Sequence, residues 1–218
     1  MKTQIFSENE WLYQDTEISQ SSNIIKLDAA RGSSVGFQLL TDQELSEDTP
    51  VNMYWSSPYI SELDFIAYQL LPARVEENRG EKLFTTLDYD SVSHFVTRQA
   101  PFYVYDVTRD IDNGLLMPGR AAFYIRIDIP KDFMPGDYEQ ELYITFNGHT
   151  ASICLKIKVY DVIIPPLKNS SFSMINWLDL DSIETTSALR RDSDEFWVLV
   201  DRYLDNQIDM RNSHIMLP

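Results

Sequence analysis

The segment between Tyr138 and Tyr160 constrains the fold of this chain more than any other part of the sequence. Apolar and polar side chains alternate along both of its halves, which is the period of a β-strand with one buried face. The apolar positions are Tyr138, Leu142, Ile144, Phe146, Ala151, Ile153, Leu155, Ile157 and Val159. Asn147-Gly148 separates the halves and supplies the positive φ angles that a tight type I′ turn requires. The segment therefore predicts a β-hairpin.

A second alternating run, Phe123–Ile129, precedes the hairpin and ends at Pro130. Because Pro135-Gly136 in the connection is typical of a turn, we expect the run and the hairpin to form three consecutive antiparallel strands. Short runs rich in β-branched and aromatic residues predict more strands upstream. These are Ile24–Leu27, Val35–Leu39, Val51–Trp55, Phe65–Leu71 and Phe102–Val107. About eight short strands predict a mainly β fold, an antiparallel immunoglobulin-like β-sandwich.

Pro165-Pro166 marks the predicted end of this sandwich. Neither proline can donate a hydrogen bond to a neighbouring strand, and each pushes the residue before it into an extended conformation. We therefore expect a β-sandwich domain at residues 1–165 and a separate segment at residues 166–218.

The periodicity changes in this second segment. It predicts a strand at Phe172–Trp177, a helix at about Ser193–Asp209 and another strand at Ser213–Leu217. Asp192 is the expected N-cap of the helix, since Glu195 follows three residues later as in a capping box. The three elements together predict a short βαβ segment.

A βαβ unit normally has both faces of its parallel strands covered, and this short segment supplies only one helix. We therefore expect residues 166–218 to begin a larger α/β domain whose remainder lies outside this chain. The alternative is that the helix packs back onto the sandwich as a small appendage.

The charge balance narrows the range of partners. The chain has 18 basic and 34 acidic residues, a formal net charge of −16, which repels nucleic acid and anionic lipid surfaces. No apolar run is long enough to cross a bilayer, and the first residues lack the apolar core of a secretory signal. Cys154 is the only cysteine and cannot form an intramolecular disulfide. These features predict a cytoplasmic protein.

The sequence offers no constellation for metal or nucleophilic chemistry. His94, His149 and His214 lie in separate predicted elements, without ligand spacing to one another or to Cys154. A Gly-rich phosphate loop and a nucleophile elbow are also absent from the sequence. The Asp194-Glu195 pair lies at the start of the predicted helix, where negative charge complements the helix dipole. We therefore expect neither a metal nor a cofactor.

Four segments, taken in order, carry a resemblance to a known family. They are Leu27–Gly32 leading into Val35–Leu39, Ala100–Asp106, Ile129–Asp132 with Pro135–Tyr138, and Val159–Asp161 with Ile164–Pro166. Together they resemble the N-terminal region of glycoside hydrolase family 123-like proteins, also described as a domain of unknown function. In that family a β-sandwich precedes a catalytic (β/α)8 barrel. The resemblance implies that Ser173–Asn176, the helix and His214–Leu217 are the first strand, helix and second strand of the barrel.

The resemblance also implies an activity, the hydrolysis of N-acetylgalactosamine-type glycosides with the substrate's own acetamido group as nucleophile. An adjacent Asp-Glu pair on a later barrel strand would carry this chemistry, so we assign no catalytic residue before Pro218. Barrel active sites form at the carboxyl ends of strands. Asn176, Trp177 and Asp179 are therefore the expected substrate-binding residues, since Asn and Asp bind hydroxyls and an indole stacks on a pyranose.

The expected function is that of a non-catalytic N-terminal module of an N-acetylhexosaminidase-like glycoside hydrolase. Its expected partner is a carbohydrate substrate, bound by the barrel that this module supports. The alternative is a stand-alone sandwich module that binds a glycan or a protein and has no enzymatic activity. In that case Tyr54, Trp55 and Tyr59 could form an aromatic platform for a glycan.

Overall fold

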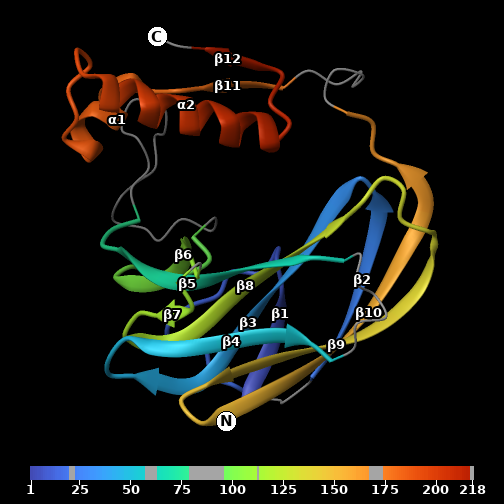
Figure 1. The fold of residues 1–218 in the computed structure, drawn as a ribbon. Helices are drawn as coiled ribbons and strands as arrows, with labels where there is room; N and C mark the ends of the chain where they lie inside the picture. Colours follow the sequence, from blue (N-terminus) through green and yellow to red (C-terminus); the bar gives the residue numbers. More distant parts are fainter. Residues whose placement is uncertain (20–22, 57–62, 79–95, 112, 167–173, 217–218) are drawn as a thin grey trace. The chain divides into compact units, whose positions relative to one another are not determined.

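The computed structural model describes residues 1–19, 23–56, 63–78, 96–111, 113–166 and 174–216 (Figure 1). These residues form a mainly β protein whose sheets are largely antiparallel, as the sequence predicts. The chain forms two compact units, Met1–Ile163 (unit 1) and Ile164–Pro218 (unit 2). In the described ranges unit 1 contains ten strands, and unit 2 contains two helices and two short strands.

Unit 1 consists of two five-stranded sheets. Sheet A has the order β1-β3-β8-β5-β6 and is antiparallel throughout. Its strands are β1 (Thr3–Ser7), β3 (Ser33–Leu45), β5 (Phe65–Val75), β6 (Phe102–Asp110) and β8 (Gly119–Ile129). Sheet B has the order β2-β10-β9-β4-β7, in which only β2 and β10 pair in parallel. Its strands are β2 (Ile24–Arg31), β4 (Thr49–Trp55), β7 (Leu115–Leu116), β9 (Gly136–Phe146) and β10 (His149–Ile163).

The predicted hairpin is formed by β9 and β10. Phe146 pairs with His149 across a two-residue turn, in which Asn147 and Gly148 have φ angles of 49° and 73°. These positive angles are those that a type I′ turn requires. The hairpin prediction is confirmed because the turn residues and the alternating pattern specify the same register.

The predicted run of three consecutive antiparallel strands is wrong. Strand β8 pairs with β3 and β5 in sheet A. Strand β9 lies in sheet B, where it pairs with β10 and β4. The connection between them carries Phe133 into the core, where it is 4% exposed and its ring lies 4.9 Å from that of Tyr138. Both strands bury one face in the same core, so their alternation is the same whether they are neighbours or lie in opposite sheets.

The eight strands expected in this unit are present, and β1 and β7 are additional to them. Both sheets contribute side chains to one large hydrophobic core, including Phe37 and Phe123 from sheet A and Leu142 and Ile153 from sheet B. The rings of Phe123 and Phe146 meet across the two sheets with their centroids 5.7 Å apart. Burial of these side chains is the main force that holds the sheets together.

A second, smaller core lies on the other face of sheet A. It contains Leu12, Leu40, Leu70, Tyr105 and Ala122. The guanidinium group of Arg120 holds the segment that follows Leu12, donating to the carbonyl oxygens of Gln14 at 3.0 Å and Thr16 at 2.8 Å. The N-terminal segment therefore covers part of a sheet face that would otherwise be open.

Unit 2 contains β11 (Ile175–Trp177), α1 (Leu180–Ser187), α2 (Asp194–Asp209) and β12 (His214–Met216). The two strands pair in parallel, with Asn176 opposite Ile215. Its core consists of Leu178, Leu180, Ile183, Phe196 and Val200. The strand–helix–strand order is therefore as predicted, with one additional helix.

The helix ends in unit 2 differ from the predictions in two details. The N-cap of α2 is Ser193, whose hydroxyl accepts from the backbone N–H of Phe196, whereas Asp192 pairs with Arg190 at 2.9 Å. Residues Leu180–Ser187, for which the sequence predicts no element, form α1. The predicted strand residues Phe172, Ser173 and Leu217 lie outside the described residues.

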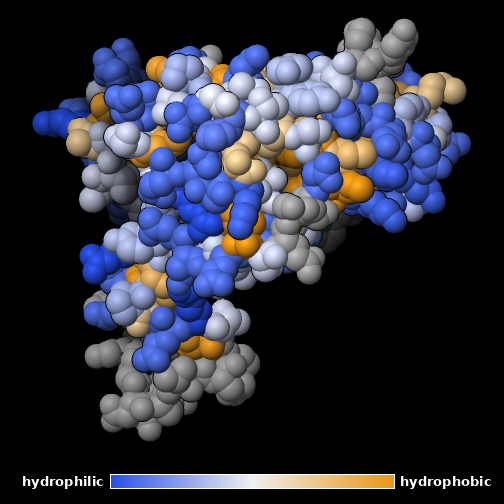
Figure 2. Space-filling view, turned by 90° about the horizontal axis from the view of Figure 1, so that it is seen from below, coloured by the Kyte–Doolittle hydropathy of each residue, from blue (hydrophilic) through white to orange (hydrophobic). Residues whose placement is uncertain are grey.

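The surface of the protein carries both hydrophilic and apolar side chains. On the face shown in Figure 2, apolar side chains form groups that are interrupted by hydrophilic ones. Within the described ranges, neither helix has the length and apolar character needed to span a membrane.

Candidate functional site

The three predicted substrate-binding residues lie at or just after the carboxyl end of β11, but they have different environments. Trp177 is 68% exposed. Asn176 faces α2, where its side-chain amide donates to Gln207 Oε1 at 2.6 Å. Its own Oδ1 accepts from the Trp177 backbone N–H at 2.9 Å. Asn176 therefore fixes β11 to α2, and of these two side chains only the indole of Trp177 is exposed to solvent.

Asp179 is the N-cap of α1. Its carboxylate accepts from the backbone N–H groups of Asp181 at 3.0 Å and Ser182 at 3.2 Å, and from the Ser182 hydroxyl at 2.6 Å. The hydrogen bond from the Ser182 hydroxyl is the main cause that lowers the pKa of Asp179 below its usual value. Asp179 therefore has a complete structural role in starting the helix.

This cap predicts a pH effect. Because the pKa of Asp179 is lower in the folded chain than in the unfolded chain, its stabilising contribution is present above the usual pKa of 3.8 and is lost as the pH falls through the lowered value. In that pH range we expect the amide NMR chemical shifts of Asp181 and Ser182 to change, because their N–H groups lose the hydrogen bonds to the Asp179 carboxylate. The matched variant is Asp179→Asn, which can cap without titrating. The same titration in this variant would contradict the assignment.

The aromatic cluster proposed as a glycan platform is divided between two faces of sheet B. Tyr54 is 46% exposed and stacks on Tyr143, with 5.4 Å between ring centroids. Trp55 faces the core, where its indole N–H donates to the Leu63 carbonyl at 3.0 Å and its ring meets Phe65 edge-on. Tyr59 lies outside the described residues. Tyr54 and Trp55 therefore do not form one shared platform.

Other chemically capable groups are dispersed. No group of three or more His, Cys, Asp or Glu side chains in the described ranges is arranged to hold a metal ion. Burial, followed by a hydrogen bond to Glu139, raises the pKa of the Cys154 thiol. Asp194 and Glu195 lie in the first turn of α2, as expected of residues that complement the helix dipole. His94 lies outside the described residues.

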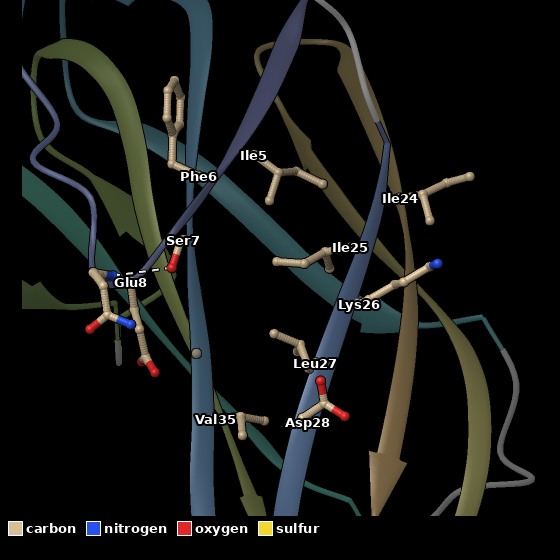
Figure 3. Close-up of a pocket in the computed structure, with 12 residues that line it drawn as sticks. Ile5, Phe6, Ser7, Glu8, Ile24, Ile25, Lys26, Leu27, Asp28 and Val35 are labelled. Carbon is tan, nitrogen blue, oxygen red and sulfur yellow. Dashed lines mark hydrogen bonds between the residues drawn. The ribbon is translucent and has the colours of Figure 1, made fainter.

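Unit 1 has a cleft of about 560 Å³ between β1, an edge strand of sheet A, and β2, an edge strand of sheet B (Figure 3). Ile5, Ile25 and Leu27 project into it, and all three pack against the large core. At its rim, Glu8 accepts a hydrogen bond from Tyr124 and Asp28 accepts one from Tyr160. Glu8 is thus bonded to sheet A and Asp28 to sheet B, and the two carboxylates do not act on a common point in the cleft. We therefore interpret the cleft as the open edge between the two sheets.

A second cleft, of about 420 Å³, was not predicted from the sequence. It lies on the outer face of sheet A, between the segment after β1 and the strands β3, β5, β6 and β8. Its lining combines the exposed ring of Trp11 with carboxylates, two side-chain amides and hydroxyl groups. The sequence offers only the presence of an aromatic residue, Trp11, as a signal for this cleft, and its exposure becomes visible only in the structure.

Comparison with known proteins shows that this chain shares its fold with a solved structure. No family model matches the chain, and no curated protein matches it. Among solved structures, the chain is similar to a family 123 glycoside hydrolase from Clostridium perfringens, with a TM-score of 0.68 and 12% sequence identity. The match covers 98% of this chain and 37% of that chain. This chain therefore spans little more than a third of that structure, and the two share a fold.

A second similar structure is a PapD-like domain of human CEP192, with 13% identity over 74% of this chain and 87% of that chain. Its TM-score is 0.33, which is below the level of a shared fold. The similarity to the family 123 enzyme supports the family 123-related fold expected from the sequence segments.

Proposed function

We propose that this chain is a module of a glycoside hydrolase-related protein. Residues 1–165 are a non-catalytic β-sandwich that supports a carbohydrate-hydrolysing domain, and residues 166–218 are the first βαβ part of its (β/α)8 barrel. The substrate class is a glycoside of N-acetylhexosamine type. The observation that carries this proposal is the similarity to the family 123 enzyme, which extends over 98% of the chain and so includes both units.

The geometry of unit 2 supports the barrel assignment. Asn176 and Ile215 form the side of the strand pair that packs on helix α2 and its core. The other side is open, since Ile175, Trp177 and Met216 are 60%, 68% and 45% exposed. Parallel strands normally bury both faces, and in a barrel the face away from the helices is filled by the remaining strands.

We assign the sugar contact to Trp177. It lies at the carboxyl end of β11, the end at which barrel enzymes build their active sites. An exposed indole offers a flat apolar surface to the C–H face of a pyranose. Asn176 and Asp179 act beside it as positioning residues, because Asn176 fixes β11 to α2 and Asp179 starts α1. The catalytic carboxyl groups would come from later barrel strands.

The test uses the full-length product of the gene that encodes this chain, assayed on aryl N-acetyl-β-hexosaminides. We expect hydrolysis, and we expect Trp177→Ala to lower kcat/KM by about tenfold, the effect of losing roughly 1.4 kcal/mol of ring stacking. The change should appear mainly in KM if the ring binds ground state and transition state equally. An inactive wild-type protein would overturn the proposal.

The matched control is Met134→Ala in unit 1. Met134 is 71% exposed, about as much as Trp177, so both variants remove a large exposed apolar side chain. Met134→Ala should leave kcat/KM unchanged. If Trp177→Ala also leaves KM and kcat unchanged in an active enzyme, the sugar-contact assignment is wrong while the enzymatic class stands.

A further inference from the structure

The cleft of about 420 Å³ on the outer face of sheet A is not used by the proposed function. Its volume lies in the range of about 300–1,000 Å³ that is typical of small-molecule sites. One wall is the segment Glu8–Leu12, and the floor includes Leu70 and Tyr105, which are 5% and 6% exposed. The buried hydroxyl of Tyr105 has no hydrogen-bond partner among the described residues, the kind of group that an ordered water or a ligand commonly satisfies.

The wall of the cleft is held in place before any ligand arrives. Gln38, only 7% exposed, donates from its side-chain amide to the carbonyl oxygens of Ser7 at 2.9 Å and Glu10 at 2.8 Å. The Ser7 backbone N–H donates in turn to the Glu10 carboxylate at 2.6 Å. A segment fixed by these bonds loses little conformational freedom on binding, which favours affinity.

Trp11 extends from this fixed wall and is 67% exposed. No hydrogen bond or ring contact of its indole occurs within the ranges that the structure describes. An exposed aromatic ring on a fixed segment beside a cleft can bury its apolar face against a ligand. Trp11 thus offers one flat apolar face to a ligand.

Two acidic groups are placed at the cleft by specific features of sheet A. Glu8 accepts from the Tyr124 hydroxyl at 3.1 Å, an arrangement that requires glycine at residue 36, because a Cβ atom there would lie 2.6 Å from that hydroxyl oxygen. Asp106 is the extra residue of a β-bulge, since Leu71 pairs with Val107 and Pro72 with Tyr105. Bulges redirect a side chain and are frequent beside functional sites.

The charge of the lining restricts the ligand. Glu8, Glu10 and Asp106 line the cleft together with no lysine or arginine. Carboxylates accept hydrogen bonds and donate none, so an anionic ligand is repelled and a ligand with several hydroxyl donors is favoured. An apolar ring face beside clustered acceptors matches a sugar, whose pyranose has a C–H face and hydroxyls at its rim.

We propose that this cleft binds a neutral saccharide, with a pyranose ring stacked on Trp11 and its hydroxyl groups donating to Glu8 and Asp106. The site is separate from the sugar contact proposed at Trp177 and does not depend on hydrolytic activity. It gives unit 1 a carbohydrate-binding role in addition to a supporting one.

The test follows the indole N–H signals of the 4 tryptophans in a nitrogen–proton NMR spectrum of this chain. The probes are N,N′-diacetylchitobiose, lactose and mannobiose, each titrated to about 10 mM so that sites with a Kd near 1 mM are detected. We expect at least one to shift the Trp11 signal in a saturable manner. Trp11→Ala and Asp106→Asn should each weaken binding by about tenfold. Met134→Ala removes an exposed apolar side chain of unit 1 outside the cleft lining and should leave binding unchanged.

Two further probes separate the competing outcomes. Glucuronic acid should not bind, because the lining repels it, and tetramethylammonium tests whether the acidic cleft instead takes a cation. The proposal is overturned if none of the three neutral probes shifts the Trp11 signal. It is also overturned if only tetramethylammonium does so and the effect disappears at high salt. Loss of hydrolysis in the full-length enzyme would not bear on this result.

Discussion

Replacing Phe123 by alanine should lower the free energy of unfolding of unit 1 by about 3–5 kcal/mol. Phe123 is 0% exposed, and its ring meets that of Phe146 from the opposite sheet at 5.7 Å. The change removes buried apolar surface and leaves a cavity that two hydrogen-bonded sheets cannot easily close. Since domains of this size are stable by about 5–15 kcal/mol, the variant should unfold at a much lower urea concentration.

The measurement is urea unfolding monitored by tryptophan fluorescence, to which Trp55 contributes because it packs edge-on against Phe65 in the same core. Val107→Ala is the matched control, because Val107 lies on the edge strand β6 and is 46% exposed. The control should change the free energy of unfolding by less than about 0.5 kcal/mol. If the two variants lost the same stability, Phe123 would not be the central contact between the sheets.

Replacing Phe196 by alanine should have a comparable effect on unit 2, a loss of about 3–5 kcal/mol. Phe196 is 0% exposed and is one of only five buried residues in the core of that unit as described. A small core has little stability to spare. We therefore expect residues 174–216 to lose protection from hydrogen exchange while β3 and β8 remain protected.

The matched control for this variant is Val198→Ala, two residues along the same helix at a position that is 55% exposed. It should leave the exchange of unit 2 nearly unchanged. Equal loss of protection in both units of Phe196→Ala would show that the two cores unfold together, contrary to the division of the chain into two compact units.

The elements that could be predicted are those in which two independent signals agree. The β9–β10 hairpin has both a turn dipeptide and an alternating pattern, and its register follows from them. Strand β1 is a short segment, Thr3–Ser7, whose pairing with Phe37–Thr41 has no local signal. The sequence also does not predict that β8 belongs to sheet A. Alternation of apolar and polar residues indicates which face of a strand is buried, but not that β3 and β5 are its neighbours.

Helix α1 was missed because its residues favour other structures. Thr185, Thr186 and Ser187 are poor helix formers, and the only buried residues of the helix are Leu180 and Ile183. The capping geometry of Asp179 and the packing against α2 outweigh these local preferences. An acidic N-cap followed by Asp181 in the first turn was the available signal.

The side-chain roles at the candidate sites depend on distant parts of the chain. Asn176 is turned toward α2 by Gln207, 31 residues later. The cleft at Trp11 depends on contacts such as that between Tyr124 and Glu8, which are 116 residues apart. No local pattern specifies these pairs. The sequence shows which residues are aromatic, but not that Trp11 and Trp177 are exposed while Trp55 faces the core.

The parallel pairing of β2 with β10 has a consequence for biosynthesis. Tyr160 and Asp28, which are hydrogen-bonded across this pair, are separated by 132 residues. Translation of 132 residues at about 5–20 residues per second leaves β2 without its partner for roughly 7–26 s after it is made. During that interval the nascent chain exposes an unpaired apolar edge, and folding of unit 1 must await its last strand. Ribosome-bound chaperones would therefore have a defined period in which to protect it.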